Sequence, residues 1–186
     1  MTILLVLDLD ETLLFADEIG TGRPADFEVA EYLVYKRPGL DAFIETIRPH
    51  FQLAVWTSST RLYAEAVVPH LFPPGLDLRF VWARDRCTQR FDPDRHEYVW
   101  TKNLSKLKRL GHALERVLIV DDSPEKLEKH YGNLVRVHPF EGNPEDRELE
   151  ALGRYLPTLS QIANVRRVEK RFWRAAHAPG RPNQKW

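Results

Sequence analysis

Short, predominantly apolar runs alternate along the chain with longer segments whose apolar residues recur at helical spacing. The apolar runs cover residues 3–7, 51–56, 78–83, 117–120 and 134–137. Runs of this length are typical of parallel strands that are buried on both faces. The helical segments cover about residues 37–47, 59–71, 104–110 and 144–156. Strands that alternate with helices predict an α/β fold with a doubly wound, mainly parallel sheet and right-handed crossovers.

The segment between the first apolar run and the first helix predicts a small flap. Residues 15–26 contain two glycines and a proline and are expected to form a loop. Residues 27–36 are rich in Val, Tyr and Phe with a polar break at 30–31, which favours a short β-hairpin outside the main sheet. Residues 87–100 are polar and are expected to form an irregular surface segment. Neither insertion leaves room for a large cap domain, so we expect only a flap at about residues 15–36.

Two of the predicted strands end in pairs of acidic residues. Asp8 and Asp10 follow the first apolar run and project to the same side if the strand geometry continues. Asp121 and Asp122 follow the fourth run. Carboxylates at one edge of a sheet repel each other unless a cation or proton lies between them, and oxygen-only ligation favours Mg²⁺. The alternative interpretation is that these acids belong to polar loops or cap the helices that follow.

Hydroxyl residues and a lysine are further candidates for chemistry. Thr57 and Ser58 follow the second apolar run, where they can cap the next helix or form part of a phosphate-binding turn at its N-terminus. On these residues alone the helix cap is the favoured interpretation. Lys102 precedes a predicted helix, where a lysine is usually a solvated surface charge.

Taken together, these motifs resemble the haloacid dehalogenase superfamily of phosphotransferases. More closely, the chain resembles its small C-terminal-domain phosphatase branch, also called the NLI-interacting-factor-like domain. The resemblance covers about residues 2–160, and its motifs occur in the order of the family. The matching segments are Asp8-Leu9-Asp10-Glu11-Thr12, Trp56-Thr57-Ser58-Ser59, Lys102 and Asp121-Asp122-Ser123-Pro124.

The resemblance implies different roles for the acidic residues. Asp8 would be the nucleophile that forms an aspartyl-phosphate intermediate. Asp10 would protonate the leaving oxygen and then activate water. Mg²⁺ would bind the Asp8 carboxylate, the Asp10 backbone carbonyl and Asp122, with Asp121 as the neighbouring carboxylate. Close eukaryotic members often have asparagine at the position of Asp122, so the acid pair is a departure that leaves metal binding intact.

The resemblance also implies which residues hold the phosphate group. Thr57, the backbone of Ser58 and Lys102 would bind its oxygens, with Lys102 as a point charge that also belongs to the catalytic set. Arg84 would add a further contact, an alignment that depends on Cys87 three residues later. The residues of the predicted flap do not match the family clearly, so the identity of the substrate does not transfer.

Composition changes this picture only at the C-terminal end. The formal net charge is zero over 186 residues, so no overall field attracts nucleic acid or membranes. The single cysteine, the lack of a basic segment before the first apolar run and the lack of an apolar membrane-spanning stretch predict a one-domain cytoplasmic protein. Residues 165–186 differ, because they hold seven Lys and Arg residues against one Glu. We therefore expect a phosphatase domain at 1–164 and a basic helix and tail at 165–186.

These observations predict a Mg²⁺-dependent phosphomonoester hydrolase that acts through an aspartyl-phosphate intermediate. A site without a large cap admits macromolecules, which favours a phosphoserine, phosphothreonine or phosphotyrosine protein phosphatase. The first alternative is a phosphatase of nucleic-acid ends or small phosphometabolites, with the basic tail as the contact to nucleic acid. The second is a non-catalytic protein-binding module, since the same branch includes a mitochondrial translocase subunit. No membrane contact is expected.

Overall fold

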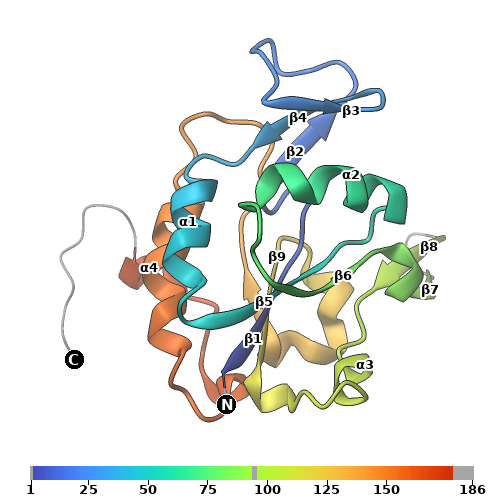
Figure 1. Ribbon diagram of the computed structural model, residues 1–186. Coiled ribbons are helices and arrows are strands. Elements are labelled where there is room, and N and C mark those ends of the chain that lie inside the picture. The colour runs from blue at the N-terminus through green and yellow to red at the C-terminus, as the bar shows by residue number, and fades with distance from the viewer. Residues whose placement is uncertain (1, 94–95, 178–186) are drawn as a thin grey trace.

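The centre of the molecule is a five-stranded parallel sheet in the order β10-β9-β1-β5-β6. The computed structural model describes residues 2–93 and 96–177 (Figure 1). The strands of this sheet are β1 (Ile3–Leu7), β5 (Phe51–Trp56), β6 (Leu78–Trp82), β9 (Val117–Asp121) and β10 (Leu134–Arg136). All four strand pairs are parallel, which confirms the predicted α/β class.

Two apolar clusters cover the two faces of the sheet. Alternate residues of β1 enter different clusters, with Leu5 in one and Val6 in the other, and all five residues of β1 are buried. The first cluster is covered by α1 (Leu40–Ile47), α2 (Arg61–Leu71) and α4 (Glu148–Leu159). The second contains residues of α3 (Ser105–Lys108), the 3₁₀ helix η2 (Leu114–Arg116) and the 3₁₀ segment η3 (Pro124–Asn133). Burial on both faces explains the unbroken apolar run of the first strand.

The flap is a three-stranded antiparallel sheet beyond the carboxyl ends of the central strands (Figure 1). Its strands, in the order β2-β4-β3, are β2 (Leu14–Asp17), β3 (Phe27–Val29) and β4 (Tyr32–Lys36). The predicted hairpin is present, with a turn at Ala30 in the left-handed region at φ 51°. The prediction of a loop from residue 15 was wrong at its start, because β2 is too short to produce a recognisable alternation. Its partner is β4, on the far side of the intervening loop.

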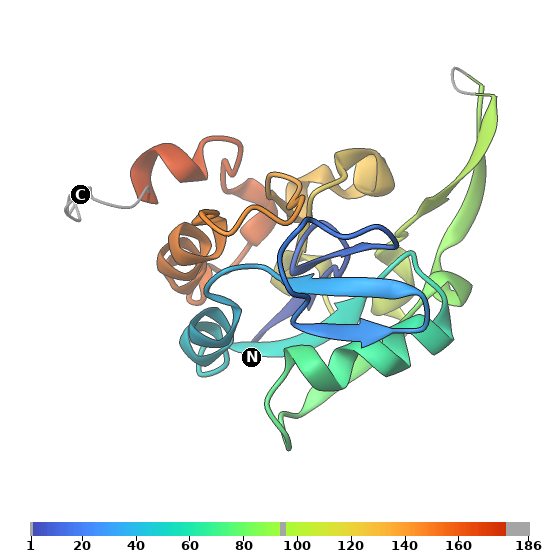
Figure 2. The same cartoon turned by 90° about the horizontal axis from the view of Figure 1, so that it is seen from above.

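A second hairpin projects from the body of the molecule (Figure 2). It consists of β7 (Thr88–Asp92) and β8 (Glu97–Thr101), paired in an antiparallel ladder, and follows the 3₁₀ turn η1 (Arg84–Arg86). The prediction of an irregular segment over 87–100 was therefore wrong. Four of the five residues of β7 are exposed, so there is no buried face to impose an apolar alternation on the sequence. The two segments form regular strands because they pair with each other, although their sequence pattern does not indicate strands.

Several helix boundaries differ from the expected ones. The predicted helix over 104–110 is limited to α3, and Leu110 is 55% exposed. The segment after Ser123 is a 3₁₀ structure with non-helical angles at two internal positions, and the Ser123 hydroxyl does not cap it. Helix α4 begins at Glu148 and not near residue 144. Each boundary depends on tertiary contacts that local spacing does not specify.

In the described part of the basic tail, the last helix packs on α4 and the turn before it packs on η2 and η3. It forms the 3₁₀ turn η4 (Val165–Arg167) and the five-residue helix α5 (Trp173–His177). The Trp173 ring is 3% exposed and stacks on Tyr155 with a centroid distance of 5.5 Å. The rest of the predicted basic tail, residues 178–186, lies outside the described residues. The division of the chain at residue 164 stays a proposal. Among the residues described, no helix is both long and apolar enough to cross a membrane.

A buried ion pair joins the flap to the start of α4. The guanidinium of Arg37 is fully buried, donates to both carboxylate oxygens of Asp146 at 2.8 Å and donates to the Thr12 carbonyl at 3.1 Å. Burial alone would raise the pKa of Asp146, but the hydrogen bonds from Arg37 and from the Glu148 N–H lower the pKa below its ordinary value of 3.8. The pair therefore stabilises the fold above that pH, and its contribution is lost as the pH falls through the lower folded-state pKa.

We expect Asp146→Asn to lower the free energy of unfolding by about 3 kcal/mol, because it leaves the Arg37 charge buried without a full partner. Urea unfolding at neutral pH measures this loss. Glu45→Gln is the matched control, because it breaks an exposed pair with Arg48 and should change the free energy of unfolding by less than about 1 kcal/mol. Equal small losses in both variants would contradict a structural role for the buried pair.

Candidate active site

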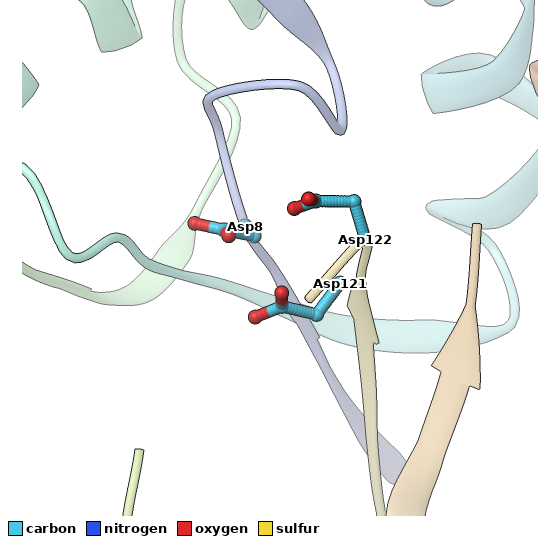
Figure 3. Close-up of side chains that lie close together, drawn as sticks. All are labelled: Asp8, Asp121 and Asp122. Atoms are coloured by element: carbon cyan, nitrogen blue, oxygen red, sulfur yellow. The ribbon is translucent and has the colours of Figure 1, made fainter. Parts of the chain in front are cut away.

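The acidic residues predicted from the sequence meet at the carboxyl ends of β1 and β9. Asp8 follows β1 directly, and Asp121 is the last residue of β9. The two strands pair with Leu7 opposite Val120, so the residues after them lie side by side. One carboxylate oxygen from each of Asp8, Asp121 and Asp122 lies within 4.8 Å of the other two, and all three residues are buried. Figure 3 shows their carboxyl groups projecting to the same side.

Lys102 lies between two of these carboxylates. It follows β8, and its Nζ is 2.9 Å from Asp8 Oδ1 and 2.6 Å from Asp121 Oδ2, with its side chain fully buried. Its backbone N–H donates to the Lys126 carbonyl at 2.7 Å, which holds the start of the following segment against η3. The ordinary interpretation of an isolated lysine, as a solvated surface charge, is therefore wrong for Lys102.

The charges of the site shift its pKa values in opposite directions. Burial alone would raise the pKa of Asp8, but the ammonium groups of Lys102 and Lys126 hold that pKa below its ordinary value. Burial and the nearby charge of Asp8 raise the pKa of Asp121 to about 7. Burial would lower the pKa of Lys102, but its carboxylate partners raise it. At neutral pH the site thus holds an ionised Asp8 beside a protonated lysine.

Asp122 is held by two hydroxyl groups at the same edge. Ser123 Oγ donates to Asp122 Oδ2 at 2.7 Å, and Thr12 Oγ1 donates to Asp122 Oδ1 at 3.4 Å. The Ser123 backbone N–H donates to Asp121 Oδ1 at 2.9 Å. The Ser123 hydroxyl therefore orients an acid and does not cap the segment that follows. The tight turn after β9 directs two successive carboxylates into the cluster.

The cluster fits a hard divalent cation. Three buried carboxylates within reach of one another supply the oxygen ligands that Mg²⁺ prefers, and their charge is not fully balanced by the two neighbouring lysines. The Asp10 side chain lies outside this group of three.

Three hydroxyl groups hold the carboxylate of Asp10 on the other side of the site. Thr57 Oγ1 and Ser59 Oγ lie 3.2 and 2.7 Å from Asp10 Oδ2, and the Tyr63 hydroxyl lies 2.8 Å from Asp10 Oδ1. Burial and the Asp10 charge raise the pKa of Tyr63, which keeps this hydroxyl a donor. Ser59 was part of the motif without an assigned role. The sequence did not indicate Tyr63, because a tyrosine at the third position of a helix is not part of a recognisable motif.

Thr57 and Ser58 do not cap α2. The cap is Thr60, whose Oγ1 accepts from the Tyr63 N–H at 3.3 Å. Thr57 is buried. Its Oγ1 accepts a hydrogen bond from the Ser59 N–H at 3.0 Å and donates one to Asp10 Oδ2. The expectation that Thr57 and Ser58 cap the helix is therefore wrong.

Arg84 lies at the outer edge of the site. Its Nε donates to the Ser58 carbonyl at 2.7 Å, and its guanidinium lies 5.8 Å from the centre of the Trp100 ring. Two pockets open beside it. One, of about 250 Å³, lies between the flap and α2 and includes Asp10, Tyr32 and Tyr63 among its lining residues. The other, of about 210 Å³, is lined by Ser58, Val99, Trp100, Thr101, Glu125 and Lys126.

Lys126 is the principal residue that the sequence did not indicate. Its Nζ lies 3.4 Å from Asp8 Oδ2 and 4.0 Å from Asp122 Oδ1. Burial would lower its pKa, but the carboxylates of Asp8, Asp121 and Asp122 raise it. The only available signal was its position four residues after Asp122, and the irregular form of η3 made helical spacing a poor guide there.

A parallel sheet with Asp8, Lys102 and Asp121 joined at its carboxyl edge defines a phosphatase of the haloacid dehalogenase type. The chain belongs, within that class, to the NLI interacting factor-like phosphatase family, whose model matches residues 3–166. These findings confirm both the predicted family and the predicted enzyme class.

Three relatives illustrate the extent of the match. The chain is 31% identical over 183 residues to CTD nuclear envelope phosphatase 1B of Danio rerio, covering 90% of this chain and 71% of the relative. It is 29% identical over 169 residues to CTD small phosphatase-like protein 2 of Dictyostelium discoideum, covering 87% of this chain and 28% of the relative. A solved structure of Fcp1, an essential RNA polymerase II CTD phosphatase, shares the fold with a TM-score of 0.66 at 18% identity, covering 85% of this chain and 62% of that one.

Proposed function

We propose that this chain is a Mg²⁺-dependent phosphomonoester hydrolase that forms an aspartyl phosphate on Asp8. The observation that carries the proposal is the buried contact of Lys102 Nζ with both Asp8 and Asp121, at 2.9 and 2.6 Å. Burying two carboxylates and an ammonium group costs free energy, because all three lose hydration. A fold that needed only stability could fill this space with apolar side chains.

Asp8 is the proposed nucleophile. Its carboxylate stays ionised because its pKa is lowered, and an ionised oxygen can attack phosphorus. The attack forms a bond from the carboxylate oxygen to phosphorus and breaks the bond from phosphorus to the leaving oxygen. Water then attacks the phosphorus of the aspartyl phosphate, which releases inorganic phosphate and restores the carboxylate.

Asp10 is the proposed general acid and base. It would donate a proton to the leaving oxygen in the first step and accept one from water in the second. The hydrogen bonds from Thr57, Ser59 and Tyr63 support this role, because they fix the orientation of the carboxylate without placing it in the metal cluster. A positioned acid contributes more than a mobile one, since less motion has to be lost in the transition state.

The residues proposed to hold Mg²⁺ are Asp8, Asp122 and the Asp10 backbone carbonyl, with Asp121 as the neighbouring acid. When bound, Mg²⁺ offsets the negative charge of the transferring phosphoryl group. Thr57, the Ser58 backbone and Lys102 are proposed to bind the phosphate oxygens, and Arg84 to contact the substrate at the outer edge. The position of Thr57 and Ser58 in the turn before α2, where Thr60 serves as the helix cap, supports this assignment.

A phosphorylated protein is the proposed substrate. The flap is small, and the two pockets beside Arg84 are open to the surface, so a peptide segment can approach the site. The relatives named as CTD phosphatases support the same class of substrate. The alternative of phosphorylated nucleic-acid ends rests on the basic segment that begins at residue 165, whose exposed residues include Arg166 and Arg167. A cytoplasmic location stays a prediction.

We expect hydrolysis of an aryl phosphate by the purified chain to fall by at least about 10²-fold when EDTA removes divalent cations, and to recover with excess Mg²⁺. Release of the aryl alcohol, followed by absorbance, measures the rate. Activity that persists unchanged in EDTA would contradict the proposed dependence on metal. A chain that binds Mg²⁺ but never turns over would instead favour the non-catalytic alternative.

A substrate panel tests the proposed substrate class. We expect higher kcat/KM on phosphopeptides than on end-phosphorylated oligonucleotides or sugar phosphates. A variant with Arg166 and Arg167 both replaced by glutamine should keep its activity on peptides. This variant is preferable to truncation at residue 164, because truncation would remove buried Val165 and Trp173. A preference for oligonucleotides that this variant loses would overturn the choice of protein substrates.

A further inference from the structure

Lys126 contacts the two carboxylates that are proposed to hold the metal. Its Nζ is 3.4 Å from Asp8 Oδ2 and 4.0 Å from Asp122 Oδ1. Lys102 contacts the opposite oxygen of Asp8, Oδ1, and Asp121. The two lysines therefore divide the carboxylate oxygens between them, and only Lys126 faces the pair formed by Asp8 and Asp122.

The two lysines differ in how firmly they are held. Both contacts of Lys102 Nζ are shorter than 3 Å, and its side chain is fully buried. Both contacts of Lys126 Nζ are longer, and its side chain is 22% exposed. The backbone of Lys126 is fixed separately, because its carbonyl accepts from the Lys102 N–H and its N–H donates to the Ser123 carbonyl at 3.1 Å. The side chain of Lys126 can therefore move while its main chain stays in place.

Space for that movement lies on two sides. Lys126 lines the pocket of about 210 Å³ that also contains Ser58 and Trp100. It also lines a pocket of about 220 Å³ between the β7–β8 hairpin and η3, next to Thr88 and Lys129. A flexible four-carbon side chain can reach either pocket by changes of rotamer alone.

We propose that Lys126 and the divalent cation compete for the carboxylates of Asp8 and Asp122. Two cations cannot both lie within contact distance of the same two carboxylates without strong mutual repulsion. Lys126 would therefore leave Asp8 Oδ2 when the metal binds, and its charge lowers the affinity of the site for metal. The inference rests on the proposed metal site, and it assigns Lys126 a role separate from the phosphate-binding role of Lys102.

Binding of Mn²⁺, measured by the loss of its free electron paramagnetic resonance signal, tests the competition without relying on turnover. Lys126→Met keeps the length of the side chain and removes its charge. We expect this variant to bind Mn²⁺ at least about tenfold more tightly than the wild type. Lys126→Arg keeps the charge and should bind within about threefold of the wild type. Lys108→Met, the matched control, removes an exposed lysine of α3 that lines neither pocket and should also leave the affinity unchanged.

Thermal unfolding provides a second measurement. Without metal, Lys126→Met should unfold at a lower temperature than the wild type, because Asp8 and Asp122 lose a counter-ion. Saturating Mg²⁺ should raise its midpoint by more than it raises that of the wild type. A folded Lys126→Met variant with unchanged or weaker Mn²⁺ affinity, beside a wild type that binds, would overturn the competition alone. Absence of Mn²⁺ binding in the wild type and in both Lys126 variants would overturn the proposed metal site as well.

Discussion

Asp8→Asn is expected to reduce kcat by about 10⁵-fold or more, since it removes the nucleophile and not merely a supporting contact. Asparagine has nearly the same shape as aspartate, so the strand and the turn after it should be preserved. Its neutral amide cannot form the acyl phosphate, and it leaves Lys102 with Asp121 as its remaining partner. Steady-state hydrolysis of an aryl phosphate in excess Mg²⁺ measures the loss.

The matched control for Asp8→Asn is Asp41→Asn. Asp41 is an exposed acid in the first turn of α1, and its replacement should leave kcat unchanged. Thermal unfolding must show that the Asp8 variant is folded, because the change also alters a buried charge cluster. A folded Asp8→Asn variant that keeps more than a small fraction of wild-type turnover would exclude Asp8 as the nucleophile.

Asp10→Asn is expected to reduce kcat by up to about 10⁴-fold on substrates with poor leaving groups, because both proton transfers lose their acid or base. The loss in the first step should be much smaller for a nitrophenyl phosphate, whose leaving oxygen needs no proton. Comparing alkyl and nitrophenyl phosphates under single-turnover conditions measures this difference. The affinity for Mn²⁺ should stay close to that of the wild type, since the Asp10 side chain lies outside the cluster of three carboxylates.

An equal loss of first-step rate on both kinds of substrate would contradict the role of Asp10 as a general acid. Tyr63→Phe offers a milder test of the same assignment. It removes one of the three hydroxyl groups that hold the Asp10 carboxylate but leaves the acid in place. A smaller reduction with the same dependence on the leaving group would assign Tyr63 to positioning Asp10.

The central sheet and its acidic edge were predictable because burial imposes a simple pattern on them. The unbroken apolar runs of β1 and β9 reflect burial on both faces, and the acids follow directly where each strand ends. The β7–β8 hairpin was not predictable, because four of the five residues of β7 are exposed and give that strand no buried apolar face. Strand β2 was missed because it is four residues long and its pairing partner lies beyond a loop.

Two residues of the site could not be predicted from the sequence for a different reason. Tyr63 and Lys126 reach the acids through long side chains, so their roles depend on the position of a whole helix or turn. Neither residue type is rare at such positions on an ordinary protein surface. The role of Lys102 could not be predicted from local sequence either. Only the resemblance to a family motif distinguished this residue from a solvated surface lysine. Burial and distances, which require the fold, separate these lysines from surface ones.

The central claim is that phosphate is transferred to Asp8, and trapping the intermediate tests it most directly. Asp10→Asn with a nitrophenyl phosphate is the best combination, because the first step needs little acid while the second lacks its base. After an acid quench, borohydride should convert the phosphorylated residue to homoserine, which peptide mass spectrometry can locate. We predict homoserine at position 8 in an amount that matches the initial burst of nitrophenol. Turnover accompanied by no modification, or by modification at any other residue, would contradict the account.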